Sequence, residues 1–378
     1  VVRSEPAPSD LLFGLLIGTA LLGGRALPIR VPVLAGVGLV GWSFVSLLSV
    51  TNATDVVRAL RYESISLYLV AAAVFVAAVV GERRLARRCL KAYIWSALFS
   101  AALGVAALKL PFFPARTLFL YDPSRAQALF KDPNVFGPYL VPAAAILAEE
   151  LVRPRLLGWR TSRVFAAFAL TCAGVVFAFS RAGWLNLAVA IAVVVGVYVA
   201  RRRGFGRAMR LVVALAVCGA IGFAFLAATG SLSFLEERSK YQSYDQERFA
   251  NQASGLARAS EHVLGYGPGQ AERVLAFSTH SLPIRLLVEQ GIVGTALFAL
   301  ILAAALGAAV GWVLRDGDLH GLGSAAMLGS LLGLLANSPF VDTLHWRHLW
   351  VVLALIWAGS AMARTPAAAG EQEAGTAE

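Results

Sequence analysis

Apolar residues fall into long unbroken stretches along the chain, and polar residues gather between them. A helix needs about 20 residues, or about 17 at the least, to cross the hydrocarbon core of a bilayer. None of the stretches alternates in polarity as the strands of a membrane barrel would. The pattern predicts an all-α fold, a polytopic transmembrane helical bundle. Its eleven visible spans are expected at 10–26, 31–50, 64–80, 92–110, 135–151, 164–180, 183–200, 211–229, 288–313, 322–338 and 348–363.

The longest polar segment, residues 230–281, separates the eighth span from the ninth. Helical periodicity runs through it from Asp245 to Leu264, and a loop of this length is more often functional than merely connecting. The GYGPG cluster that follows, Gly265–Gly269, is expected to be a tight turn with glycines in left-handed conformations. No βαβ pattern surrounds this cluster, so it does not indicate a nucleotide site.

The chain is therefore expected to have four parts. Spans one to eight occupy 1–229, the long extracytoplasmic loop occupies 230–281, and spans nine to eleven occupy 282–364. The tail at 365–378, rich in alanine and glutamate, is expected to be disordered and cytoplasmic.

The composition excludes a single soluble domain, because 58% of the residues are hydrophobic and only 15% are charged. The net charge of +11 comes largely from three basic clusters beside the spans, which also attract anionic lipid headgroups. No basic domain or aromatic-basic module accompanies them, so we expect membrane lipid as a partner and no nucleic acid. The clusters are Arg83, Arg84, Arg87, Arg88 and Lys91; Arg153, Arg155, Arg160 and Arg163; and Arg201, Arg202, Arg203, Arg207 and Arg210.

An even number of spans separates each basic cluster from the next, so all three lie on one side of the membrane. Positive residues in short loops mark the cytoplasmic side. Counting spans from these clusters assigns five connections to the extracytoplasmic face: the turn at 180–183 and the loops near 51–63, 111–134, 230–281 and 339–347. The first residue, Val1, also falls outside, so we expect one earlier span in the full-length protein, which makes twelve.

The three cysteines, Cys89, Cys172 and Cys218, form no CxxC motif and no pair within the outer loops. Neither a disulfide framework nor a thiolate metal site is indicated. We therefore expect no metal and no cofactor.

Four segments of the chain occur in a particular order. They are KDPNVFGPYLVPA (Lys131–Ala143), SRAGW (Ser180–Trp184), the pattern from Arg248 through GYGPG, and THSLPIRLLVEQGIVG (Thr279–Gly294). In this order, and with this topology, they resemble the O-antigen ligase and polymerase superfamily over roughly residues 40–310.

The resemblance implies a metal-independent, inverting glycosyltransferase that faces outward from the bacterial inner membrane. Such enzymes take a glycan from an undecaprenyl-diphosphate carrier and join it to a hydroxyl of an acceptor. The acceptor is lipid A-core in ligases and another carrier-linked glycan in polymerases. The resemblance assigns the diphosphate to Arg181 and Arg248, and the reacting centre to His280.

The chemistry of these residue types is compatible with the implied roles. A guanidinium stays ionised and offers paired hydrogen bonds to a phosphate, so Arg181 and Arg248 together could replace a metal ion. An imidazole of near-neutral pKa can accept the proton of the acceptor hydroxyl, so His280 is a candidate general base or an acceptor-orienting residue. Each residue also has a structural alternative: Arg181 as a headgroup contact, Arg248 as an ion-paired surface residue, and His280 as an interfacial histidine.

Other polar residues are weaker candidates for binding substrate. Asp132 and Asn134 could bind sugar hydroxyls or could simply begin a helix. Arg285 follows His280 closely enough to touch the same site, and Glu289 lies one helical turn further on, where the two can pair. A last cluster is expected mainly to anchor the chain at the membrane interface, although its own role stays open: Asp342, His345, Arg347 and His348.

Two other classes of protein remain as alternatives. A transporter or flippase of lipid-linked sugars would place charges within spans and show an internal repeat, and neither is evident. A membrane scaffold would tolerate the loss of His280 and Arg181. Within the enzyme class, the sequence does not separate a ligase from a polymerase, because the two differ in acceptor recognition.

Overall fold

All eleven apolar stretches form helices in the computed structural model, which describes residues 8–24, 28–201, 205–228, 230, 232–275 and 277–364. Six of these helices are long and apolar enough to cross a membrane, and five are shorter apolar helices. The tail at 365–378 and the start of the chain lie outside the described residues. The apolar helices are α1 (Pro8–Leu22), α2 (Val33–Ser49), α3 (Val56–Val79), α4 (Arg83–Lys109), α5 (Pro133–Val152), α6 (Thr161–Phe177), α7 (Arg181–Ala200), α8 (Phe205–Ala228), α12 (Leu282–Leu314), α13 (Ser324–Asn337) and α14 (Arg347–Met362).

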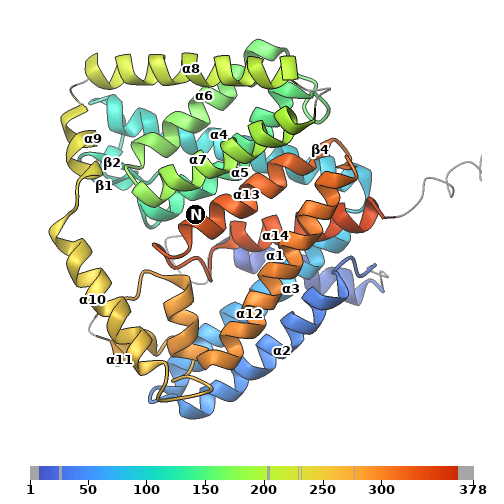
Figure 1. Cartoon of the computed structure of the whole chain (residues 1–378), viewed down its shortest axis with the longest axis vertical. Helices are drawn as coiled ribbons and strands as arrows, with labels where there is room; N and C mark the ends of the chain where they lie inside the picture. The colour runs from blue at the N-terminus through green and yellow to red at the C-terminus, as the bar shows by residue number, and fades with distance from the viewer. Residues whose placement is uncertain are drawn as a thin grey trace, which may run out of the picture.

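The helices pack into a bundle in which α13 lies against α7 and α5, α12 against α2, and α14 against α3. Figure 1 shows the remaining helices, α9 (Leu232–Ser239), α10 (Ser243–Arg258) and α11 (Ala271–Val274), along one side of this bundle between α8 and α12. The contact between α13 and α7 is close, because a Cβ atom at Gly329 would lie 2.5 Å from the Ala190 carbonyl oxygen. Such small-residue contacts are typical of helices packed within membranes.

The structure is mostly helical, as predicted, and contains only short strands among its described residues. Two short antiparallel hairpins are present, formed by β1 (Leu120–Asp122) with β2 (Arg125–Ala126) and by β3 (Asp318–Leu319) with β4 (Leu322–Gly323). They lie between helices, where a reversal of a few residues satisfies backbone hydrogen bonds. Two 3₁₀ turns, η1 (Val50–Asn52) and η2 (Arg116–Leu118), complete the elements.

Members of the three basic clusters meet at one end of the bundle. Arg87 donates to the Leu156 carbonyl oxygen at 2.8 Å, and both Arg153 and Arg201 pair with Asp316, at 2.7 and 2.6 Å. The first cluster lies within the first turns of α4 rather than in a loop, because the helix continues past the apolar stretch. Arg202 and Arg203 lie outside the described residues. We call this the basic end, and the opposite end, which carries 230–281, the loop end.

Candidate active site

One cavity of about 2040 Å³ opens among the helix ends at the loop end of the bundle. Its wall draws on α5, α7, α10, α12 and the segment before α12, which are far apart in the chain. The fold thus brings all seven sequence-predicted site residues to one chamber: Asp132, Asn134, Arg181, Arg248, His280, Arg285 and Glu289.

Helix α10 supplies Arg248 and also holds the segment that presents His280. The Asn251 side-chain amide donates to the Phe277 carbonyl oxygen at 2.7 Å, and the Gln252 amide donates to the Thr279 carbonyl oxygen at 3.1 Å. These side chains lie within about one turn of Arg248 on the same helix. A single element therefore positions both a cation and the imidazole.

The backbone at His280 is left-handed, with a φ of 44°, a conformation that residues other than glycine rarely adopt. Such conformations are held by surrounding contacts and cluster at functional sites. The side chain is open to the cavity, yet desolvation by the cavity wall lowers the pKa of the imidazole, and the charge of Arg248 lowers it further. The charges of Asp132 and Asp342 raise the pKa of the imidazole but do not cancel this shift. His280 is therefore a neutral imidazole near neutral pH, as a general base must be.

Arg181 is the first residue of α7, after Ser180, whose hydroxyl oxygen accepts from the Gly183 N–H at 3.2 Å. Its guanidinium pairs with Asp245 of α10 at 2.5 Å. Burial disfavours ionisation of Asp245, but the hydrogen bonds from Arg181 and the Gln242 N–H and the charges of Arg181 and Arg248 together outweigh it and lower the pKa of this carboxyl. The pair joins the loop 230–281 to the bundle and leaves Arg181 on the cavity wall.

Arg248 is not the ion-paired surface residue of the structural alternative, because the neighbouring carboxylate of Asp245 pairs with Arg181 instead. Its guanidinium donates to the carbonyl oxygen of Phe340, and no ion pair to it is present among the described residues. The charges of Asp245 and Asp132 nonetheless act on it. Arg248 therefore offers the cavity a cation that no carboxylate neutralises directly.

Asp132 and Asn134 begin α5, as the helix-entry alternative expects. The Asp132 carboxylate accepts from the Asn134 N–H at 2.6 Å and caps the helix. The Asn134 side chain in turn accepts from Arg125 at 3.3 Å. Because α5, α7 and α12 all begin at this cavity, the positive ends of three helix dipoles face it. Helix N-termini of this kind favour anions such as phosphate.

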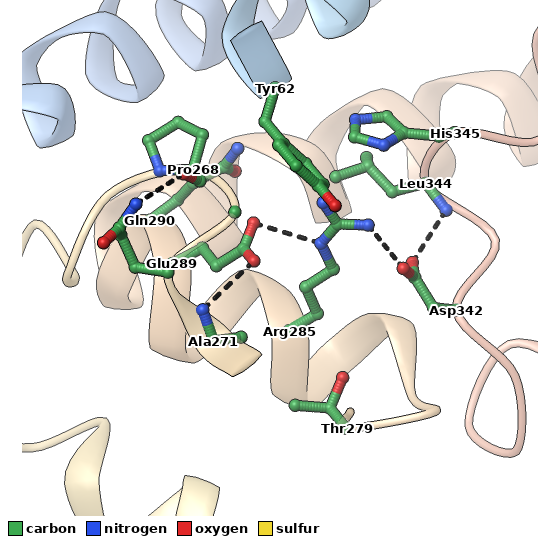
Figure 2. Close-up of polar contacts among 12 residues, drawn as sticks. Tyr62, Pro268, Ala271, Thr279, Arg285, Glu289, Gln290, Asp342, Leu344 and His345 are labelled. Atoms are coloured by element: carbon green, nitrogen blue, oxygen red, sulfur yellow. Dashed lines mark hydrogen bonds and ion pairs between the residues drawn. The ribbon is translucent and has the colours of Figure 1, made fainter. Parts of the chain in front are cut away.

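Arg285 and Glu289 form the i,i+4 pair that the sequence predicts, with 3.0 Å between the Arg285 Nε and a Glu289 carboxylate oxygen. Figure 2 shows the guanidinium held on its other side by Asp342, which comes from the loop between α13 and α14. Burial alone would raise the pKa of Asp342, but the charge and hydrogen bond of Arg285, together with the hydrogen bond from the Leu344 N–H, outweigh it, so the pKa is lowered. The three residues form a buried ionic network at the edge of the cavity.

Helix α12 breaks just beyond this network. Gly291 has a φ of 64° and a ψ of −169°, and the GYGPG turn packs into the break. The N–H groups of Tyr266 and Gly267 donate to the carbonyl oxygens of Val288 and Glu289 at 2.8 and 2.9 Å. Gly265, Gly267 and Gly269 all have positive φ, which confirms the expected turn. The turn therefore has a structural task, since it satisfies carbonyl groups that the broken helix leaves free.

Sequence reasoning missed Tyr62, which contacts the ionic network, and left the role of His345 open. The Tyr62 ring lies 5.4 Å from the Arg285 guanidinium and 5.7 Å from the His345 ring (Figure 2). Burial and the charge of Arg285 lower the pKa of His345 to about 3, so this imidazole stays neutral. Asp342, His345, Arg347 and His348 all line the cavity rather than only a membrane interface. The available signal was the run of charged and aromatic residues at the predicted outer end of a span.

Among the described residues, no group of three or more histidines, cysteines, aspartates or glutamates is arranged to hold a metal ion. The cationic groups of the cavity are instead guanidinium side chains, with Lys131 as an exposed ammonium at its edge. The arrangement suits the binding of an anion by organic cations and helix ends.

The cavity continues from the loop end between α3 and α4 toward the basic end. Its wall includes Leu69, Ala73 and Val76 of α3, and Tyr93 and Cys89 of α4. From Arg58 to Val76 the lining of α3 covers about 27 Å at the rise of an α-helix, which is close to the thickness of a hydrocarbon core. The deep part offers mainly apolar surface.

The O-antigen ligase family matches residues 166–299 of this chain. The matched segment includes Arg181, Arg248, His280, Arg285 and Glu289, together with the loop that carries α9 to α11. No curated protein gives a significant match. With the apolar helices described above, the match supports a membrane glycosyltransferase of the ligase or polymerase kind, and it confirms the chain's resemblance to the O-antigen ligase superfamily.

Proposed function

We propose that this protein transfers a glycan from undecaprenyl diphosphate to a hydroxyl of an acceptor at the outer face of the bacterial inner membrane. The observation that carries the proposal is the convergence of Arg181, Arg248 and His280 on one cavity. The loop 230–281 is then the catalytic loop. The match to the O-antigen ligase family supports the same chemistry.

The proposed reaction is a single displacement at the anomeric carbon of the first sugar. The acceptor oxygen forms the new glycosidic bond while the bond from that carbon to the diphosphate oxygen breaks. The electron pair of the broken bond stays on the diphosphate, and the hydroxyl proton passes to the His280 imidazole. Attack opposite the leaving group inverts the configuration of the anomeric carbon.

Charge complementarity supports the roles of the two arginines. Negative charge grows on the diphosphate as the bond breaks, and Arg181, Arg248 and the N-termini of α5 and α7 face the cavity in which it would develop. Guanidinium groups remain ionised throughout the physiological range. The scheme therefore uses no metal ion.

The deep part of the cavity suits the isoprenoid chain of the carrier. Leu69, Ala72, Ala73 and Val76 of α3 line it beyond the polar end. An apolar chain that leaves the bilayer for this surface keeps an apolar environment. The diphosphate would then reach the arginines while the tail lies between spans.

The activity that we propose first is that of a ligase, with lipid A-core or a similar molecule as the acceptor. A polymerase of O-antigen or exopolysaccharide would use the same donor and a second carrier-linked glycan. The size of the cavity, about 2040 Å³, leaves room for donor and acceptor groups together. Recognition of the acceptor decides between the two.

A transporter or flippase of lipid-linked sugars is a second candidate, because the cavity continues to Val76 and Cys89 near the basic end. The distribution of charge favours the enzyme. The charged residues of the described cavity wall lie in loops or within about two turns of helix ends at the loop end. A path for a charged headgroup would need polar partners along its whole length.

The test is glycan transfer by purified protein in lipid vesicles, with undecaprenyl-diphosphate-linked oligosaccharide as donor. Product that requires added lipid A-core identifies a ligase, and longer carrier-linked chains without core identify a polymerase. Both activities are expected to survive EDTA. Movement of labelled carrier between leaflets without a new glycosidic bond would overturn the proposal in favour of transport.

A further inference from the structure

Exposed aromatic side chains surround the polar end of the cavity. Tyr121 and Tyr241 line it while 58% and 65% of their surface is accessible, and Phe249 and Phe340 line it with 49% and 43% accessible. Large rings that stay this exposed within a cavity wall leave much of their surface open to a ligand. The reaction scheme above gives them no task.

The two tyrosines lie in segments that contact arginines of the same wall. The Arg125 guanidinium lies 5.6 Å from the Tyr121 ring. Arg181 donates to the carbonyl oxygen of Lys240, the residue before Tyr241, at 3.2 Å. A group attached to an anion bound at Arg181 would therefore share a wall with these exposed rings.

The ligand chemistry that fits rings beside phosphate-binding cations is a sugar attached to a phosphate. The face of an aromatic ring carries partial negative charge, so the polarised C–H groups on one face of a pyranose stack against it. Polar side chains for the hydroxyls lie next to both tyrosines, with Asp122 beside Tyr121 and Gln242 beside Tyr241. An isoprenoid chain would not use these polar neighbours.

We propose that Tyr121 and Tyr241 form a carbohydrate subsite that holds the glycan of the lipid-linked substrate next to the diphosphate. This inference rests on the proposed function. Tyr121 lies in the β1–β2 hairpin and Tyr241 between α9 and α10, away from the stretch of α3 that suits the tail. The subsite binds the sugar, whereas the arginines bind the diphosphate and the deep part of the cavity binds the isoprenoid chain.

The experiment compares two probes in a binding measurement with the whole protein in nanodiscs. One probe is undecaprenyl diphosphate without sugar, and the other is the lipid-linked glycan extracted from the source organism. Tyr121→Ala and Tyr241→Ala are expected to raise the Kd for the glycan-bearing carrier by roughly threefold to tenfold each. The Kd for the bare carrier should not change, and Tyr121→Phe and Tyr241→Phe should bind both probes as the wild type does.

Matched controls come from exposed aromatics that are not part of the cavity wall. Phe112 is 82% exposed in the segment before Tyr121, and Phe44 is 60% exposed on α2. Their alanine variants should bind both probes normally. Equal weakening of both probes, or of neither, by the tyrosine variants would overturn the carbohydrate subsite. Failure of the wild type to bind even the bare carrier would instead overturn the proposed function itself, and the subsite with it.

Discussion

His280 lies between charges of opposite sign, and its ionisation follows from them. Arg248 lowers the pKa of the imidazole, whereas Asp132 raises it, and burial makes the net shift downward. A general base acts in its neutral form, so activity should fall only as the pH drops through this lowered pKa, below the ordinary value near 6.5.

The two neighbours should move the pH dependence in opposite directions. Arg248→Gln removes a positive charge and is expected to shift the acid limb of kcat/KM to higher pH. Asp132→Asn removes a negative charge, keeps a side chain that can cap α5, and is expected to shift the limb to lower pH. The measurement is the pH profile of residual activity. If the acid limb of both variants lay at the same pH as in the wild type, His280 would be excluded as the titrating base.

The network of Arg285 gives a prediction about stability. Arg285→Met would leave the buried carboxylate of Glu289 and the half-buried carboxylate of Asp342 without their cation, at a cost of roughly 3–5 kcal/mol. Arg273→Met is the control, because about half of the Arg273 side chain is exposed, and its ion pair with Asp55 contributes about 0–1 kcal/mol. Thermal unfolding in detergent should show a clearly larger drop for Arg285→Met. Equal drops would mean that the network does not stabilise the fold.

The sequence predicts contacts within one helix better than contacts between elements. The pair of Arg285 and Glu289 follows from a spacing of four residues. The third member, Asp342, comes from a loop more than fifty positions away, and Tyr62 comes from α3. No local sequence pattern predicts that these segments contact one another.

At the scale of elements, the break in α12 is the feature that shapes the site. A Cβ atom at Gly291 would lie 1.9 Å from the Val263 carbonyl oxygen, and its φ of 64° is unfavourable for other residues. Gly291→Ala is therefore expected to displace the GYGPG turn, lower the unfolding temperature and abolish transfer.

Gly307 provides the matched control for this substitution. It lies in the same helix with open space around its Cα, so Gly307→Ala should leave activity unchanged and stabilise the helix by about 0.5–1 kcal/mol. Thermal unfolding and transfer assays of both variants make the comparison. A Gly291→Ala protein as stable and active as the wild type would show that the turn does not depend on the break.

The hydrophobic pattern locates helices well and their ends poorly. Helix α3 begins at Val56 rather than near 64, and α4 begins at Arg83 rather than near 92. The polar first turns of both helices extend beyond the apolar stretches, because backbone hydrogen bonding continues where side chains leave the lipid. The break at Gly291 was not predicted, because a single glycine near the polar start of an apolar stretch, after Glu289 and Gln290, also occurs within continuous helices.

At the scale of the molecule, charge distinguishes the two ends. Arg87, Arg153 and Arg201 meet at the basic end, whereas the candidate site lies at the loop end. This arrangement agrees with the prediction that the basic clusters share one side. Which side faces the cytoplasm follows from the positive-inside rule and stays a prediction.

Labelling of single cysteines tests this orientation. In a variant whose own cysteines are replaced, Ser260→Cys in the exposed loop should react with a membrane-impermeant maleimide added to spheroplasts. Arg84→Cys at the basic end should react only after permeabilisation. Both positions are exposed on the protein, so access depends on the membrane. The reverse pattern would place the cavity on the cytoplasmic side and contradict the proposed use of an outward-facing donor.

The central claim is that His280 takes the proton of the acceptor hydroxyl, and one comparison tests it most directly. Purified wild type, His280→Ala and His262→Ala would be assayed for glycan transfer in lipid, with correct folding checked by thermal unfolding. His262 is an exposed histidine of the same loop that is not part of the cavity wall. We expect His280→Ala to lose about 10²- to 10⁴-fold in kcat while His262→Ala stays near the wild type. Wild-type transfer by His280→Ala would contradict the account.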